Sequence, residues 1–167
     1  MATITFQGNP TKTSGTLPAV GTQAPDFKLT KNDLSTTSLS DFKGKRVVMN
    51  IFPSIDTGVC ATSVKNFNER ATQLENTAVL CISRDTPFAQ SRFVNDEGLE
   101  NIVNLSDLKD GSFGKDYGLT IAEGPFEGLH SRAVVVLDES GSVIYNEQVP
   151  EIAQEPNYLA ALKTLLK

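Results

Sequence analysis

Residues 45–60 read KRVVMNIFPSIDTGVC, and this stretch decides how the rest of the chain is interpreted. After two basic residues it is a nearly continuous apolar run, as is typical of a strand buried inside a sheet. Pro53 and Gly58 then interrupt the run and indicate a loop. From Cys60 onward, apolar side chains recur with helical spacing, at Val64, Phe67, Ala71 and Leu74. The stretch therefore predicts a buried strand, a loop, and a helix with a cysteine in its first turn.

Similar patterns occur on both sides of this unit. The other predicted elements are strands at 3–7, 27–30, 77–83 and 101–107, a hairpin at 131–149, and helices at 87–98 and 158–166. The last helix is amphipathic, with an apolar set made up of Leu159, Leu162 and Leu166 together with Tyr158 and Leu165. This order predicts an α/β, thioredoxin-like fold with a mixed central sheet, flanking helices and an N-terminal β-hairpin extension. Residues 1–167 are expected to form a single domain.

Composition narrows the classes of function. Hydrophobic residues make up 39% and charged residues 21% of the 167 residues, which is ordinary for a globular protein. The net charge of −5 argues against a nucleic-acid or anionic-membrane surface. No apolar run approaches the roughly 20 residues of a membrane span, and the first ten residues lack the pattern of a secretion signal. We therefore expect a cytoplasmic protein with no nucleic-acid or membrane partner.

The residue types that bind metals are scarce. The chain has two cysteines, Cys60 and Cys81, without a CxxC motif, and one histidine, His130. Zinc sites need a cluster of such ligands, so no metal is expected. A single histidine also leaves little room for a Ser-His-Asp arrangement. We interpret His130 as an exposed loop residue, although a catalytic base is the alternative.

Cys60 has two opposing interpretations. Free cysteines are often buried and inert. The first turn of a helix, however, presents unpaired N–H groups and the positive end of the helix dipole, which favour the nucleophilic thiolate. Lowering a thiol pKa from about 8.5 to about 6 takes roughly 3.4 kcal/mol. Because a helix end supplies only roughly 0.3–2 kcal/mol, a nearby cation is needed for much of the rest.

A longer pattern of residues favours the reactive interpretation. Pro53, Thr57 and Cys60 have the spacing P-x-x-x-T-x-x-C, which resembles the active-site motif of the peroxiredoxins. The segments NIFPSIDTGVCATSV, VLCIS, PFAQSRF, GLHSRAVVVLDESG and EPNYLAAL, in this order, resemble the bacterial thiol peroxidases, the atypical two-cysteine branch of that family. The resemblance covers nearly the whole chain. It implies a thioredoxin-like fold and a thiol-dependent peroxidase that needs no cofactor.

The resemblance also implies roles for four residues. Cys60 attacks the terminal peroxide oxygen and becomes a sulfenic acid. Thr57 holds the thiolate and a peroxide oxygen with its hydroxyl, and Pro53 shields the pocket, although a turn residue and a strand terminator are the alternative interpretations. Arg132 stabilises the thiolate and the leaving oxygen. Without the resemblance, an arginine at the start of a strand is more often exposed.

Position 94 departs from the family, whose members carry a resolving cysteine directly after SRF. This chain has Val94 there, and valine forms no disulfide. Three explanations stay open: a substitution that traps one redox state, a natural enzyme resolved by an external thiol, or Cys81 as the resolver. We rank Cys81 last because it lies in an apolar strand and reaches Cys60 only if the helix start unwinds.

The expected activity is therefore reduction of hydroperoxides, both alkyl hydroperoxides and hydrogen peroxide. The resemblance implies a homodimer and reduction by thioredoxin, with another thiol as the alternative because Val94 removes the usual disulfide. Four apolar neighbours of Cys60 favour an alkyl hydroperoxide: Phe52, Ile55, Val59 and Phe93. The competing hypothesis is a peroxide sensor or redox-regulated binding protein whose surface changes when Cys60 is oxidised.

Overall fold

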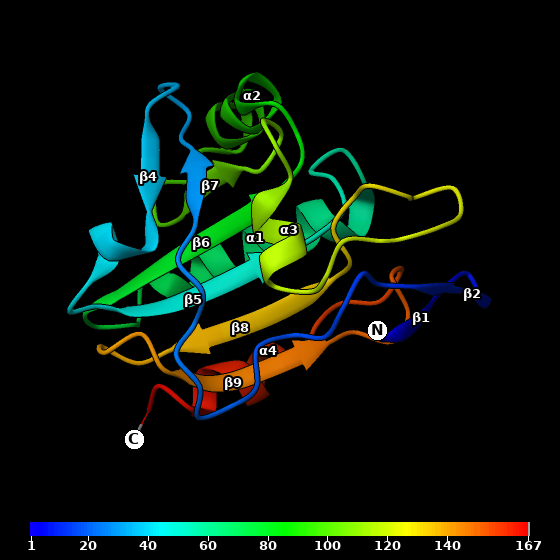
Figure 1. The fold of residues 1–167 in the computed structure, drawn as a ribbon. Coiled ribbons are helices and arrows are strands. Elements are labelled where there is room, and N and C mark those ends of the chain that lie inside the picture. Colours follow the sequence, from blue (N-terminus) through cyan, green and yellow to red (C-terminus); the bar gives the residue numbers. More distant parts are fainter. Residues whose placement is uncertain (167) are drawn as a thin grey trace.

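The computed structural model describes residues 1–166 as a mixed sheet flanked by helices (Figure 1). In chain order, the elements are β1 (Thr3–Phe6), β2 (Asn9–Lys12), β3 (Lys28–Thr30), β4 (Thr36–Ser38), the 3-10 helix η1 (Leu39–Phe42), β5 (Arg46–Ile51), α1 (Gly58–Ala71), β6 (Thr77–Ser83), α2 (Pro87–Glu97), β7 (Val103–Ser106), α3 (Ser112–Asp116), β8 (Ala133–Leu137), β9 (Val143–Gln148) and α4 (Tyr158–Lys163). The seven-stranded sheet has the order β4-β3-β7-β6-β5-β8-β9. Strands β5, β6 and β7 run parallel, and the other neighbours are antiparallel. Strands β1 and β2 form a separate hairpin, so the predicted mixed sheet and N-terminal extension are confirmed.

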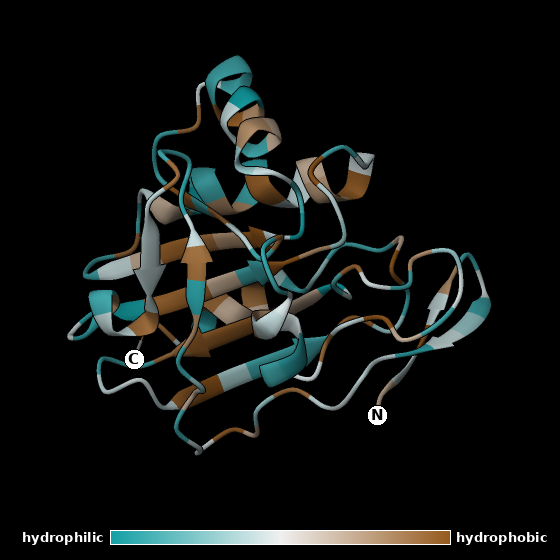
Figure 2. Ribbon diagram, turned by 45° about the horizontal axis from the view of Figure 1, so that its top comes forward, coloured by the Kyte–Doolittle hydropathy of each residue, from teal (hydrophilic) through white to brown (hydrophobic). Residues whose placement is uncertain are grey.

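The central strands are apolar because both faces of the sheet are covered. Every residue of β8 is buried, and in β5 only Arg46 is partly exposed. One face packs on α3 through Phe113, and the opposite face packs on α1 and α4 through Phe67 and Ala161. Figure 1 shows α3 in front of the sheet with α1 and α4 behind it, and the central strands are largely brown in Figure 2. Helices therefore cover both faces, as predicted.

Helix α1 begins where the sequence pattern places it. Thr57 is the N-cap residue with an extended backbone, and Cys60 is the third residue of the helix. The buried side chains of the helix include Val64 and Phe67, from the predicted apolar face. Because β5 ends at Ile51 and α1 begins at Gly58, the loop between β5 and α1 places Cys60 beyond the carboxyl end of the strand.

The apolar face predicted for the terminal helix is wrong in part. Leu159 is 64% exposed and Leu166 is 75% exposed. The prediction is confirmed for Leu165, which is buried in the cluster between this helix and the sheet, and for Leu162 and Tyr158, which pack against it in part. Ala161, which was not predicted, is also buried there. The helix ends at Lys163, so the periodicity does not extend to Leu166; the small Ala161 side chain, rather than a leucine, is the helical residue fully buried against the sheet.

Glu151 joins the β1–β2 hairpin to the last part of the chain. Its carboxylate accepts hydrogen bonds from the Ala153 amide at 2.8 Å, the Gly8 amide at 2.9 Å and the Thr5 hydroxyl at 3.0 Å. The backbone adds a hydrogen bond from the Ile152 amide to the Thr5 carbonyl at 2.8 Å. The donors, with the Ala153 amide first and the Gly8 amide second, lower the pKa of Glu151 from 4.5 to about 2.

The lowered pKa of Glu151 gives a test of this connection. Because the folded-state pKa lies below the unfolded one, its contribution to stability is present above pH 4.5 and is lost as the pH falls toward 2. We expect Glu151→Gln to lower the melting temperature at neutral pH by roughly 2–4 °C. The difference from the unsubstituted protein should shrink as the pH falls through this window, as followed by circular dichroism. Glu123→Gln, at an exposed position, is the control, and a difference independent of pH would contradict the assignment.

Candidate functional site

Cys60 and Arg132 are distant in the sequence but adjacent in the structure. Arg132 immediately precedes β8, and the first residue of that strand, Ala133, pairs with Ile51 at the end of β5. The end of β5 and the start of β8 therefore lie at the same edge of the sheet. There, Arg132 Nη2 donates a hydrogen bond to Cys60 Sγ at 3.2 Å. The residues are 0% (Cys60) and 1% (Arg132) exposed, so the interaction is shielded from water.

The guanidinium of Arg132 is a buried cation with one nitrogen unused. Its Nε donates to the Ile152 carbonyl at 2.7 Å, which fixes the plane of the group beside Cys60. Its Nη1 is buried and has no hydrogen-bond partner within residues 1–166. No carboxylate in that part of the chain forms an ion pair with it. Since a guanidinium stays charged when buried, the site places a positive charge against Cys60 Sγ and offers Nη1 to an additional oxygen.

The loop before α1 places Thr57 and Pro53 near the helix start. The Thr57 hydroxyl donates to the Ser54 carbonyl at 3.0 Å, so it acts as a turn residue in this state. Its oxygen keeps lone pairs that accept a hydrogen bond from a bound molecule. Pro53 is buried at the end of β5, and Thr57 is half-buried. Thr57 therefore has the turn role that the sequence left as its alternative, and Pro53 follows the end of the strand, as its alternative interpretation expects.

Cys60 shares one apolar cluster with Cys81 and Val94, and both thiols are free. The other members of the cluster are Phe52, Ile55, Val64 and Leu99, with Phe93 and Ile102 partly buried. Burial raises the pKa of the Cys81 thiol to about 12, and its 3.9 Å contact with the Asn50 amide offsets only part of this effect. Cys81 is therefore protonated at neutral pH and is a poor nucleophile.

His130 is buried, so the prediction of an exposed loop histidine is wrong. It is 0% exposed, and its Nε2 forms a 2.8 Å hydrogen bond with Asp107 Oδ2. The same carboxylate accepts hydrogen bonds from the Phe113 and Gly114 amides at the start of α3. The sequence hides this pair because His130 and Asp107 are 23 residues apart and meet only in the fold.

Sequence analysis missed Asp85, which bonds directly to the loop that carries Cys60. Its carboxylate accepts hydrogen bonds from the Ser54 hydroxyl and the Ile55 amide, both at 2.7 Å. The available signal was its position just after β6, because the carboxyl ends of neighbouring parallel strands meet at one edge of a sheet.

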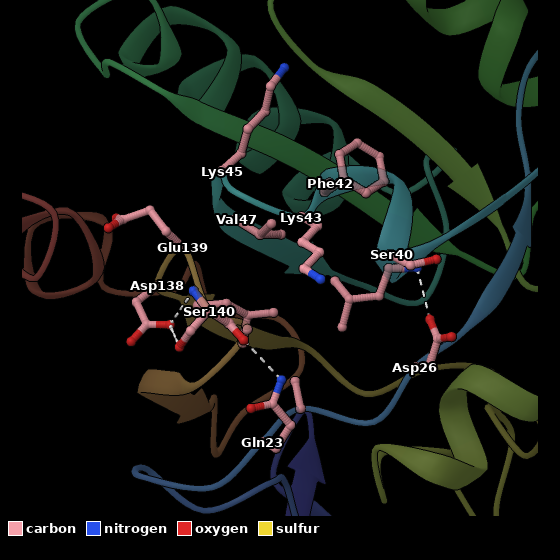
Figure 3. Close-up of a pocket in the computed structure, with 14 residues that line it drawn as sticks. Gln23, Asp26, Ser40, Phe42, Lys43, Lys45, Val47, Asp138, Glu139 and Ser140 are labelled. Atoms are coloured by element: carbon pink, nitrogen blue, oxygen red, sulfur yellow. Dashed lines mark hydrogen bonds between the residues drawn. The ribbon is translucent and has the colours of Figure 1, made fainter.

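A cavity of about 330 Å³ lies at the opposite edge of the sheet from Cys60 (Figure 3). Val47 near the start of β5 and Leu137 at the end of β8 line it, whereas Cys60 follows the end of β5 and Arg132 precedes β8. No cysteine or histidine is among its lining residues, and its carboxylates Asp26 and Asp138 accept hydrogen bonds from neighbouring residues. The cavity therefore has no nucleophile for a peroxide and is separate from the Cys60 site.

None of the helices within residues 1–166 is long and apolar enough to cross a bilayer. The same residues contain no group of three or more histidine, cysteine, aspartate or glutamate side chains that is suited to holding a metal ion.

Three comparisons with known proteins agree with the geometry. The family model described as Redoxin matches residues 19–162. A thiol peroxidase of Mycobacterium tuberculosis is 57% identical over 165 residues, which cover 99% of this chain and 99% of the relative. The crystal structure of a peroxiredoxin-like protein from Aquifex aeolicus has a TM-score of 0.94 at 36% identity, covering 99% of this chain and 96% of the other. A thiol peroxidase from Chromobacterium violaceum shares the fold, with a TM-score of 0.91 at 23% identity and coverage of 98% and 95%.

Proposed function

Because the chain belongs to the Redoxin family and, within it, to the thiol peroxidases, it reduces peroxides with electrons from thiols, and we propose that Cys60 is the residue that attacks the peroxide. The observation that supports this role is the 3.2 Å hydrogen bond from Arg132 Nη2 to Cys60 Sγ in a buried site. The other thiol, Cys81, has a pKa raised to about 12 and lies in the core. Cys60 is thus the better nucleophile of the two.

In the proposed first step, the Cys60 thiolate attacks the terminal oxygen of a hydroperoxide. A sulfur–oxygen bond forms, the oxygen–oxygen bond breaks, and the sulfur loses two electrons to become a sulfenic acid. The leaving oxygen takes up a proton and departs as an alcohol or as water. Nη1 of Arg132 donates to the oxygen on which charge develops, and the Thr57 oxygen accepts a hydrogen bond from the peroxide. Pro53 keeps water from this face of the sulfur.

In the proposed second step, an external thiol resolves the sulfenic acid, because Val94 supplies no sulfur. The thiol condenses with the sulfenic acid, releases water and forms a mixed disulfide with Cys60. A second thiol attacks this disulfide and returns Cys60 to its reduced state. Electrons from two thiols therefore balance the reduction of one peroxide.

Several finer properties complete the proposal. We propose that thioredoxin is among the thiol reductants, that the chain forms a homodimer, and that residues 1–167 work as one domain. The two free cysteines fit a reducing compartment such as the cytoplasm. The apolar side chains of Phe52 and Ile55 in the Cys60 cluster, with Phe93 partly buried there, favour an alkyl hydroperoxide over hydrogen peroxide.

Intact-mass analysis after one equivalent of peroxide tests both Cys60 and Val94. We expect the unsubstituted chain to gain one oxygen at Cys60, located by peptide mapping, because position 94 has no sulfur and the buried Cys81 thiol is a poor nucleophile. Val94→Cys should instead lose two hydrogens per chain as an intramolecular disulfide forms, and its turnover with thioredoxin should rise. Loss of two hydrogens in the unsubstituted chain would show that Cys81 resolves Cys60 and would overturn the external-thiol step.

Repeated turnover separates an enzyme from the alternative role of Cys60 oxidation as a signal. We expect peroxide consumption to exceed the protein concentration many times when dithiothreitol or a thioredoxin system is supplied. Consumption that stops at one peroxide per chain would favour the peroxide sensor or redox-regulated binding protein instead.

A further inference from the structure

Asp85 is the hydrogen-bonding centre of the segment between β6 and α2. Its Oδ1 accepts from the Ser54 hydroxyl at 2.7 Å, and its Oδ2 accepts from the Ile55 amide at 2.7 Å and the Ser83 hydroxyl at 2.6 Å. Its own carbonyl accepts a hydrogen bond from the Ser106 hydroxyl at the end of β7. The bond from Ser106 therefore fixes the Asp85 backbone, and the Asp85 carboxylate in turn binds Ser54 and Ile55, two consecutive residues of the loop before α1.

The contacts continue from Ser54 to the start of the catalytic helix. The Ser54 hydroxyl, which donates to Asp85, accepts from the Asp56 amide at 3.1 Å. The Ser54 carbonyl accepts from the Thr57 hydroxyl at 3.0 Å and from the Thr57 amide at 3.2 Å. Since Thr57 caps α1 and Cys60 is the third residue of that helix, the position of Ser54 determines where both side chains lie.

The same network reaches α2. The fully buried Gln90 donates through Nε2 to the Ser83 hydroxyl at 3.1 Å and to the Leu105 carbonyl at 2.9 Å. Ser83 in turn donates to Asp85. A continuous path of hydrogen bonds therefore joins the helix that contains position 94 to the loop that contains Thr57.

We propose that Asp85 is a positioning residue of the peroxidase, whose carboxylate fastens the Ser54–Cys60 loop in the form that attacks peroxide. The proposal rests on the peroxidatic role of Cys60 proposed above. Asp85 acts through Ser54 and Ile55 and does not itself contact the sulfur. Hydrogen bonds to an ionised carboxylate are stronger than neutral ones, so a single acidic side chain suffices to order the loop.

This role predicts opposite effects on two reactions of Cys60. Attack on peroxide needs Cys60, Thr57 and Arg132 in place together, so a loosened loop slows oxidation. A thiol reagent larger than hydrogen peroxide, by contrast, must reach a cysteine that is 0% exposed. A loosened loop therefore speeds alkylation of Cys60. A merely destabilised protein speeds alkylation only in proportion to its unfolded fraction, and it leaves oxidation of the folded chain nearly unchanged because the folded chain retains the same loop.

The experiment compares the full-length protein with Asp85→Asn, Ser54→Ala and Asp56→Asn. Single-turnover oxidation by hydrogen peroxide is followed by quenching and intact mass, and alkylation of Cys60 by iodoacetamide is followed by peptide mapping. Asp85→Asn should slow oxidation about tenfold, the loss expected from weakening hydrogen bonds to a charged group. It should also speed alkylation several-fold. Ser54→Ala, which removes one of the two bonds to the loop, should give intermediate values for both rates.

Asp56→Asn is the matched control, because Asp56 is in the same loop but its carboxylate forms an exposed ion pair with Arg92. Both rates of this variant should stay within about twofold of the unsubstituted protein. If Asp85→Asn oxidises at the unsubstituted rate, or if its faster alkylation is fully accounted for by the unfolded fraction measured by urea titration, the positioning role is wrong. If Cys60 of the unsubstituted protein reacts no faster with peroxide than Cys60 of the urea-unfolded chain, the proposed function itself fails.

Discussion

Replacing Cys60 by serine should lower kcat/KM for hydroperoxides by at least about 10³-fold, a loss typical for removal of an enzyme nucleophile. A serine hydroxyl has nearly the same shape but is protonated at neutral pH, and its oxygen does not take up the peroxide oxygen. Arg132 Nη2 keeps an acceptor in this variant, so the buried guanidinium is not left without its partner. The loss should therefore appear in catalysis and not in the melting temperature. A coupled assay that follows consumption of the thiol reductant measures it.

Cys81→Ala is the control for Cys60→Ser, because Cys81 is the second thiol of the same apolar cluster. This variant should retain peroxide turnover, with a modest fall in stability from the small cavity it leaves in the core. Activity that survives in Cys60→Ser but disappears in Cys81→Ala would show that the roles of the two sulfurs have been assigned the wrong way round.

Arg132→Lys should lower kcat/KM by about 10²–10³-fold, although the positive charge is retained. A guanidinium bonds the Ile152 carbonyl and Cys60 Sγ at once and still presents Nη1, whereas the ammonium of lysine is one compact group. The variant therefore loses the donor that faces the developing charge. The rate of Cys60 alkylation by iodoacetamide should also change, because the sulfur loses its oriented donor.

Arg92→Lys is the matched control for Arg132→Lys. Arg92 pairs with Asp56 at 2.6 Å, and its side chain is 57% exposed, so the exchange should change neither kcat/KM nor the alkylation rate. An unchanged kcat/KM in Arg132→Lys would mean that charge alone is sufficient. The fork geometry of the guanidinium would then play no part in the reaction.

The central unit of the fold is predictable because its signals are local. A continuous apolar run gives β5, and helical spacing from Cys60 onward gives α1. Helix α3 was not predicted, since five residues with a glycine among them are too few for a periodic pattern. The exposure of Leu159 was also missed, because periodicity shows that a helix has an apolar face but not which of several apolar residues meets the sheet.

From the residues alone, Cys60 stands out only by its place in the first turn of a helix. Pro53, Thr57 and Arg132 enter the prediction through the family resemblance, and the structure brings Arg132 to Cys60 from 72 residues away. The buried His130 bonds to a residue 23 positions away. Asp85 bonds to the loop at Ser54, which is 31 positions away. Side chains of these types are usually exposed, so nothing in the sequence indicates that His130 is buried, and the only signal for Asp85 is its position just after a predicted strand.

The hairpin formed by β1 and β2 contributes to the Cys60 site although neither strand touches it. Thr5 bonds to Pro150, 145 residues later, and the Ile152 amide that bonds to the Thr5 carbonyl belongs to the residue whose carbonyl orients Arg132. A substitution that releases the hairpin therefore also frees the acceptor that holds the guanidinium beside the sulfur. The geometry of the reactive pair thus depends on a peripheral element that carries no reacting group.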